Sequence, residues 1–170
     1  MNADQKSLQK DDPIALARRL GEILLARGLK LVTAESCTGG GLGAAVTAIP
    51  GSSRWYEGGY VTYSNAMKQD LMGVRPDTLQ HYGAVSGETA AEMAQGALQR
   101  TGTDLSVAIT GIAGPDGGTF DKPIGTVWIA IARRGQPAAS QHHQFFGDRE
   151  TIRRSAVLNA LLSLIDVLIK

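Results

Sequence analysis

A segment rich in small hydroxyl residues is the first part of the sequence that could do chemistry. Residues 32–40 read Val-Thr-Ala-Glu-Ser-Cys-Thr-Gly-Gly, where a predicted strand ends and glycines open a predicted helix. The free N–H groups of a first helical turn favour negative charge, so this turn could hold a phosphate or the oxyanion of an acyl-transfer intermediate. In the second case Ser36 is the nucleophile. The local pattern fits equally well with Ser36 and Thr38 as plain helix caps.

A serine hydroxyl is a poor nucleophile and needs a base. The three histidines, His81, His142 and His143, have no triad-like partner near them in the sequence, and we interpret them as surface or structural residues. Lys68 lies in a predicted short helix over residues 65–72. A lysine titrates at about 10.4, so a neutral amine near pH 7 requires burial in a closed apolar pocket that lowers the pKa by roughly 3 units. Without such a pocket Lys68 is a solvated helix residue.

Two further segments carry groups that could bind an anion. Residues 109–118 form a glycine-rich loop after a predicted strand, but they lack the Gly-Lys-Ser/Thr ending of a Walker A loop, and no helix clearly follows as in a dinucleotide fingerprint. The loop is either an anion-binding nest or a tight connection between strands. Just before the last predicted helix, Asp148 is a candidate N-cap and Arg149 could pair bidentately with a phosphate or carboxylate.

The composition fits one globular domain. The chain has 170 residues, 43% of them hydrophobic, and we expect a flexible lead over residues 1–12 and a single domain over 13–170. The net charge of +1 gives no basic excess for nucleic-acid binding. One cysteine, Cys37, with no signal peptide and no membrane-spanning run, predicts a cytoplasmic protein. No cluster of metal ligands is present, so neither a metal nor a cofactor is expected.

Hydrophobic periodicity predicts a mixed α/β fold. Helices are expected over residues 13–28, 41–49, 65–72, 76–82, 86–98 and 149–168, and strands over 29–34, 56–63, 105–110, 125–132 and 140–146. Helices alternate with strands early in the chain, and the strands become sequential late. This order predicts a mixed sheet of about five strands with helices on both faces.

Taken together, these segments resemble the CinA C-terminal domain family, whose characterised members are PncC-type nicotinamide mononucleotide amidohydrolases. The similarity runs from about Ile14 into the C-terminal helix. It rests on seven matching stretches, namely residues 33–40, 51–53, 59–65 with Lys68, 83–86, 109–118, 122–128 and 146–149.

The resemblance implies a three-layer α/β/α sandwich and a metal-free Ser/Lys hydrolase that converts nicotinamide mononucleotide to nicotinate mononucleotide and ammonia in NAD recycling. It assigns Ser36 as nucleophile, Lys68 as base and Tyr63 as an assisting residue. The candidate substrate-binding residues are Thr38, Gly39 and Gly40, whose N–H groups would hold the oxyanion, together with Thr110, Gly111, Gly114 and Arg149 around the rest of the substrate.

The expected partner is a small nucleotide substrate rather than nucleic acid or a membrane, and a homo-oligomer is expected. Two other functions remain open from the sequence. One is a non-catalytic nucleotide or phosphate sensor, in which Ser36 only caps its helix. The other is a Ser/Lys amidase that acts on a different small amide. The family's larger members carry an additional N-terminal domain, and we expect no activity of that domain here.

Overall fold

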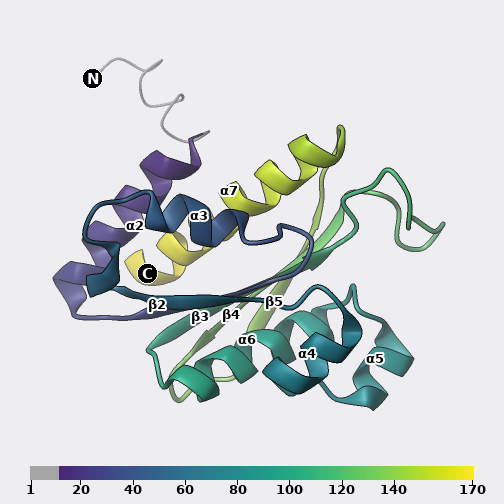
Figure 1. Ribbon diagram of the computed structural model, residues 1–170, viewed down its shortest axis with the longest axis horizontal. Coiled ribbons are helices and arrows are strands. Elements are labelled where there is room, and N and C mark those ends of the chain that lie inside the picture. The colour runs from purple at the N-terminus through teal and green to yellow at the C-terminus, as the bar shows by residue number, and fades with distance from the viewer. Residues whose placement is uncertain (1–11) are drawn as a thin grey trace.

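The computed structural model describes residues 12–170, and its centre is a five-stranded mixed sheet (Figure 1). The strand order is β2-β1-β3-β4-β5, with β2, β1 and β3 parallel and β4 and β5 antiparallel to their neighbours. The bounds are β1 (Leu31–Glu35), β2 (Tyr56–Val61), β3 (Leu105–Gly111), β4 (Thr126–Arg133) and β5 (Ala139–Gln144). The predicted mixed sheet is therefore confirmed. Apart from Asp12, the expected flexible lead lies outside the described residues.

Helices cover both faces of the sheet and complete three layers (Figure 1). Helices α2 (Pro13–Arg27), α3 (Gly41–Thr47) and α7 (Arg149–Ile169) pack together on one face. Helices α4 (Asn65–Met72), α5 (Pro76–Tyr82) and α6 (Gly87–Thr101) lie on the other, with α6 directly against the strands. None of the helices within residues 12–170 has the length and apolar character needed to cross a bilayer.

Capping residues fix several helix starts. The side chains of Asp12, Ser86 and Asp148 each accept a hydrogen bond from an N–H of the first turn of α2, α6 and α7, and the predicted cap at Asp148 is thereby confirmed. Ser64 caps α4 in the same way. A short 3₁₀ helix, η1 (Ser52–Arg54), follows α3.

The two faces of the sheet bury different side chains. Large aliphatic residues of β3, such as Leu105 and Ile109, pack against α2, α3 and α7. The face under α6 is lined mainly by small residues, including Ala108 and Ala130. Small side chains let α6 approach the sheet closely, and the Ser106 hydroxyl donates to the Ala94 carbonyl at 2.6 Å.

Side-chain alternation along β1 determines what the next residues face. Leu31 belongs to the core under α3, whereas Val32 and Ala34 belong to the core under α6. Because neighbours on a strand point to opposite faces, Glu35 lies on the α3 side and Ser36 is directed toward the layer that contains α4. The end of β1 therefore separates a carboxylate and a hydroxyl onto opposite sides of the sheet.

Strand β2 ends at Val61, two residues earlier than the sequence predicts. The Thr62 N–H still donates to the Glu35 carbonyl at 2.8 Å, but the carbonyls of Thr62 and Tyr63 accept hydrogen bonds from Lys68. The chain leaves the sheet here because α4 begins at Asn65.

Candidate active site

Ser36 lies at the junction of β1 and the turn that leads into α3. Its N–H donates to the Ile109 carbonyl at 2.9 Å, which continues the β1–β3 ladder by one residue, and its side chain is nearly buried. Gly39 and Gly40 then adopt positive φ angles of 59° and 92°, which favour glycine because it has no Cβ. The turn satisfies part of its own backbone, since the Gly39 N–H donates to the Ser36 carbonyl at 3.0 Å.

Lys68 reaches Ser36 from α4 and is 1% exposed. Its Nζ donates to the Ser36 Oγ at 3.0 Å, to the Thr62 carbonyl at 2.9 Å and to the Tyr63 carbonyl at 3.2 Å. Within the described part of the chain, no carboxylate forms an ion pair with this amine. Burial lowers the pKa of Lys68 from its ordinary value, because a charged ammonium is poorly solvated there.

Ser36 and Lys68 open into one pocket of about 250 Å³. Its walls come from the nucleophile turn, the glycine-rich loop after β3, the connection between α5 and α6, and the start of α7. The lining residues are Ser36, Cys37, Tyr63, Lys68, Ala84, Val85, Thr110, Gly111, Ile112, Ala113, Gly114, Asp116, Gly117 and Arg149. The predicted residues Ser36, Lys68, Tyr63, Thr110, Gly111, Gly114 and Arg149 therefore lie around the same cavity.

Three predicted substrate-binding residues do not line this pocket. The Thr38 side chain is buried and its hydroxyl donates to the Glu35 Oε2 at 2.7 Å. Gly39 is exposed, and Gly40 borders a different, smaller hollow beside β2. The N–H of Gly39 is also already bonded within the turn, so it is not free to hold an oxyanion.

Arg149 connects two walls of the pocket. Its Nη1 donates to the Gly114 carbonyl at 2.7 Å, and its Nη2 donates to the Tyr63 Oη at 3.3 Å. The Tyr63 hydroxyl therefore faces Arg149, and the group of Tyr63 that meets Lys68 is the backbone carbonyl. Both side chains belong to exposed residues, and Tyr63 is 62% exposed.

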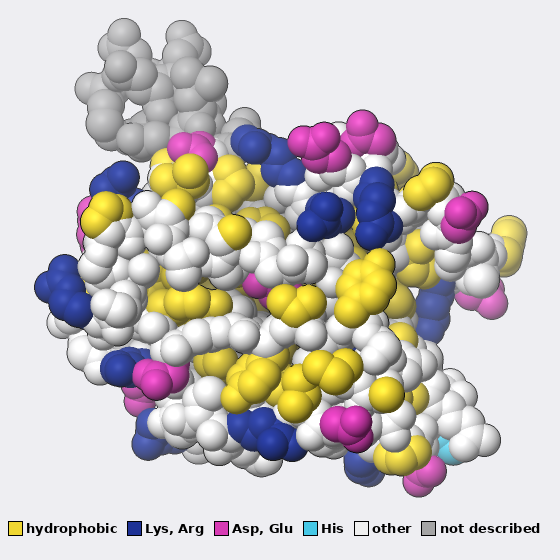
Figure 2. All heavy atoms as spheres, in the orientation of Figure 1, with side chains coloured by type: hydrophobic (Ala, Val, Ile, Leu, Met, Phe, Trp, Pro, Cys, Tyr) yellow, Lys and Arg dark blue, Asp and Glu magenta, His cyan; other side chains and the backbone are white. Residues whose placement is uncertain are grey.

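Exposed apolar side chains lie close in the sequence to Tyr63, which lines the pocket. On the face drawn in Figure 2, hydrophobic side chains gather between the regions of α3 and α4. The exposed apolar residues of this part of the chain are Val61, Tyr63 and Met67.

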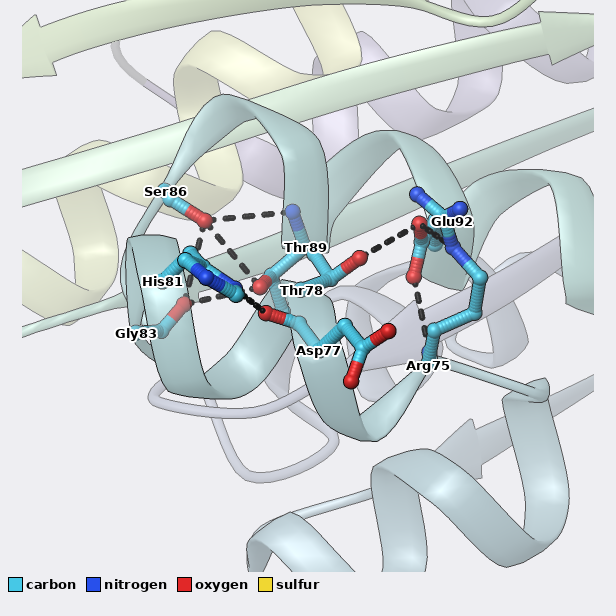
Figure 3. Close-up of polar contacts among 8 residues, drawn as sticks. All are labelled: Arg75, Asp77, Thr78, His81, Gly83, Ser86, Thr89 and Glu92. Atoms are coloured by element: carbon cyan, nitrogen blue, oxygen red, sulfur yellow. Dashed lines mark hydrogen bonds and ion pairs between the residues drawn. The ribbon is translucent and has the colours of Figure 1, made fainter.

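One wall of the pocket is formed by residues without functional side chains, and the sequence did not predict it. Ala84 and Val85 line the cavity, and the Thr110 hydroxyl donates to the Ala84 carbonyl at 2.7 Å. Figure 3 shows how the neighbouring residues are fixed, since Ser86 and Thr89 both donate to the Gly83 carbonyl. Thr110 thus positions the opposite wall, a role that its place at a strand end did not reveal.

Cys37 also lines the pocket, next to Ser36. Burial raises the pKa of its thiol to about 11, so the thiol is protonated at neutral pH. A protonated, buried thiol is a weak nucleophile. Of the two neighbouring side chains, Ser36 is the one in hydrogen-bond contact with an amine of lowered pKa.

Comparison with known proteins places this chain in one family. The CinA C-terminal domain matches residues 14–168. The chain is 48% identical over 149 residues to the nicotinamide-nucleotide amidohydrolase PncC of Escherichia coli K12, covering 88% of this chain and 90% of that protein. It is 49% identical over 157 residues to PncC of Pseudomonas putida, covering 92% and 98%.

Solved structures agree. A CinA superfamily protein from Escherichia coli superposes with a TM-score of 0.89 at 40% identity, covering 98% of this chain and 94% of that one. The competence/damage inducible protein CihA of Agrobacterium tumefaciens gives a TM-score of 0.89 at 43% identity, covering 93% and 96%. The chain belongs to the CinA C-terminal domain family, and the predicted family and α/β fold are confirmed.

Proposed function

We propose that this chain hydrolyses the carboxamide of nicotinamide mononucleotide to give nicotinate mononucleotide and ammonia. One observation carries the proposal: a buried lysine amine without a carboxylate partner among the described residues lies 3.0 Å from a serine hydroxyl at the floor of a pocket. The names of the relatives support the substrate. They also confirm that the chain is of a hydrolase type.

Ser36 attacks the carboxamide carbon while the neutral Lys68 amine accepts its proton. The tetrahedral intermediate carries a negative charge on its oxygen. Because the Gly39 N–H is bonded within the turn and Thr38 does not line the pocket, we assign this oxyanion to the N–H of Cys37, which does line it. The lysine then protonates the departing nitrogen, so ammonia leaves and an ester to Ser36 remains.

Water hydrolyses this ester in the second half of the reaction. Lys68 accepts a proton from the water as it attacks and returns the proton to the Ser36 oxygen as nicotinate mononucleotide leaves. Each half-reaction restores the amine to its neutral form. The step therefore consumes one water and requires no other reactant.

Arg149 is the proposed ligand of the 5′-phosphate. Its guanidinium lies at the pocket rim and uses only part of its five N–H donors on Gly114 and Tyr63. Planar guanidinium donors match phosphate geometry. Gly111 and Gly114 of the glycine-rich loop line the pocket, and this loop is the proposed contact for the rest of the substrate.

The deciding experiment measures ammonia release from nicotinamide mononucleotide by the purified protein, beside a panel of other small amides and the Ser36→Ala variant. Release from the nucleotide that depends on Ser36 supports the proposal. Release from another amide alone replaces the substrate but keeps the chemistry. Nucleotide binding without any turnover supports the non-catalytic sensor.

The remaining features belong to the same proposal. They are a role in pyridine-nucleotide recycling, a cytoplasmic location, independence of nucleic acid and a homo-oligomeric assembly. The assembly is tested by light scattering of the purified chain, and a monomer at micromolar concentration contradicts it.

A further inference from the structure

Glu35, the residue directly before the nucleophile, is a buried carboxylate, and it is 1% exposed. Burying a carboxylate is costly unless its oxygens are well bonded. Here Oε2 accepts from the Thr38 hydroxyl at 2.7 Å and from the Leu42 N–H at 3.0 Å, and Oε1 accepts from the Gly43 N–H at 2.8 Å. No ion pair to Glu35 exists within residues 12–170.

The same turn is held from its other side by α7. The Nη2 of Arg153 donates to the Thr38 carbonyl at 2.8 Å. Thr38 is therefore fixed at its hydroxyl by Glu35 and at its carbonyl by Arg153. The short segment that carries Ser36 is thus tied to the end of β1, the start of α3 and the first turns of α7.

We propose that the carboxylate of Glu35, acting through Thr38, is a positioning device that holds the Ser36 hydroxyl at proton-transfer distance from Lys68. Glu35 faces the α3 side of the sheet, so it does not touch the substrate and acts only through the turn. The inference rests on the proposed Ser/Lys chemistry. It assigns a functional role to a residue that otherwise only caps a helix.

The energetic argument sets the size of the effect. Misplacing a reacting group by about 1 Å can lower a rate about 100-fold. Loss of the Thr38 hydroxyl leaves Oε2 of Glu35 with one donor, the Leu42 N–H, instead of two and frees the turn to shift. We expect kcat to fall at least about 10-fold while KM changes little, because the substrate-binding walls are separate from this contact.

The test uses Thr38→Val, which keeps the shape and removes the hydroxyl, and Thr38→Ser, which keeps the hydroxyl. Glu35→Gln is the complementary change. Its amide oxygen can still accept from the Thr38 hydroxyl and the Leu42 N–H, but its NH₂ group then faces the Gly43 N–H, which also donates. Matched controls exist between α5 and α6, where Glu92 accepts from the Thr78 hydroxyl at 2.8 Å in the same manner (Figure 3). The controls are Thr78→Val and Glu92→Gln.

Two readouts separate this inference from the proposed substrate. The first is kcat and KM for nicotinamide mononucleotide. The second is the rate at which a small fluorophosphonate modifies Ser36, followed by intact mass, which depends on the Ser36–Lys68 geometry and not on the nucleotide. A wild-type chain that reacts with the probe but releases no ammonia contradicts the substrate and leaves the positioning role measurable.

We expect Thr38→Val and Glu35→Gln to slow probe modification at least 10-fold, with rescue in Thr38→Ser and wild-type rates in both controls. All variants are compared at equal folded fraction by near-ultraviolet circular dichroism. If Glu35→Gln does not fold, Thr38→Val decides. Folded Thr38→Val with a wild-type modification rate, or a loss no larger than that of Thr78→Val, overturns the inference.

Discussion

Two regions on the α4–α6 side of the sheet treat a basic side chain in opposite ways. At the Ser36 site, Lys68 is buried and its amine donates to a hydroxyl and two carbonyls. Between α5 and α6, Arg75 is 73% exposed and its Nε pairs with the Glu92 carboxylate at 2.8 Å. Burial of Lys68 disfavours its charged form, whereas the Arg75 guanidinium favours the charged form of Glu92. Within residues 12–170, the lack of a carboxylate counterion to Lys68 is what distinguishes the proposed catalytic region.

The largest effect is expected from a change at Ser36, the proposed nucleophile. Ser36→Ala removes the attacking oxygen but leaves the fold and the pocket walls in place. Loss of a serine nucleophile typically costs on the order of 10⁴- to 10⁶-fold in kcat, so we expect turnover to fall below detection. Ammonia release measured beside a thermal melt checks this. A folded variant that retains more than a few per cent of activity removes Ser36 from the mechanism.

The second largest effect concerns the amine. Lys68→Met keeps an unbranched side chain of similar length and removes the base, and general-base catalysis contributes about 10²- to 10⁴-fold. We expect kcat to fall by that factor with a smaller change in KM. Lys30→Met is the control, since Lys30 is an exposed lysine paired with Glu57 at 2.9 Å. Equal activity losses in the two variants would contradict a special role for the buried amine.

The third prediction addresses the pocket rim. Arg149→Ala removes the only arginine that lines the cavity within residues 12–170. A charge-assisted hydrogen bond contributes about 1.5–3 kcal/mol, so KM for the nucleotide should rise roughly 10- to 100-fold. Nicotinamide riboside, which lacks the phosphate, should be affected much less. Arg75→Ala serves as the exposed-arginine control, and an equal effect on both substrates would exclude phosphate binding by Arg149.

The pH dependence of activity sharpens the contrast further. Burial lowers the pKa of Lys68 below its ordinary value of 10.5, and the reaction requires the neutral amine. The rate should therefore rise about tenfold per pH unit until the lowered pKa is reached and then level off. A pH profile of kcat/KM should show this limb below pH 10.5 in wild type and not in Lys68→Met. A limb at or above the ordinary value would show a solvated amine.

The smallest effect is on stability. Hydrogen bonds from Arg75 and Thr78 outweigh the partial burial of Glu92 and lower its pKa, so its contribution is full above its ordinary value of 4.5 and is lost as the pH falls through the lowered folded value. Lys68 behaves differently: between its lowered folded pKa and 10.5 the unfolded chain binds more protons, so stability rises with pH there.

Urea unfolding across pH separates the two contributions. Glu92→Gln should lower the free energy of unfolding by about 1 kcal/mol at neutral pH and leave catalysis unchanged. Lys68→Met should flatten the alkaline rise. An activity loss in Glu92→Gln would contradict a purely structural role of Glu92. An unchanged alkaline slope of stability in Lys68→Met would contradict a lowered pKa of Lys68.

Much of this arrangement was predictable from local sequence. Asp148 marks a helix start because a capping side chain acts within three residues, and the structure confirms it. Helices α4 and α5 begin and end where the sequence places them. The pocket contacts of Ser36, Lys68 and Arg149 follow from segments that were already singled out.

The rest depends on contacts between distant residues. Glu35 resembles an ordinary charge at the end of a strand until α3 folds back and supplies its N–H donors. The direction of the Tyr63 hydroxyl is decided by Arg149, which lies 86 residues further along the chain. Ala84 and Val85 line the pocket because of where the chain places them, and their small apolar side chains give no sign of this role in the sequence.

The protonated state of Cys37 has a practical consequence. This is the one thiol in the chain, it is buried, and its pKa of about 11 leaves almost no thiolate at neutral pH. Oxidants and alkylating reagents attack the thiolate. The proposed catalytic site is thus expected to withstand peroxide and iodoacetamide under native conditions. Reagents directed at serine and at cysteine therefore report separately on the Ser36 Oγ and the Cys37 Sγ, which belong to the same turn.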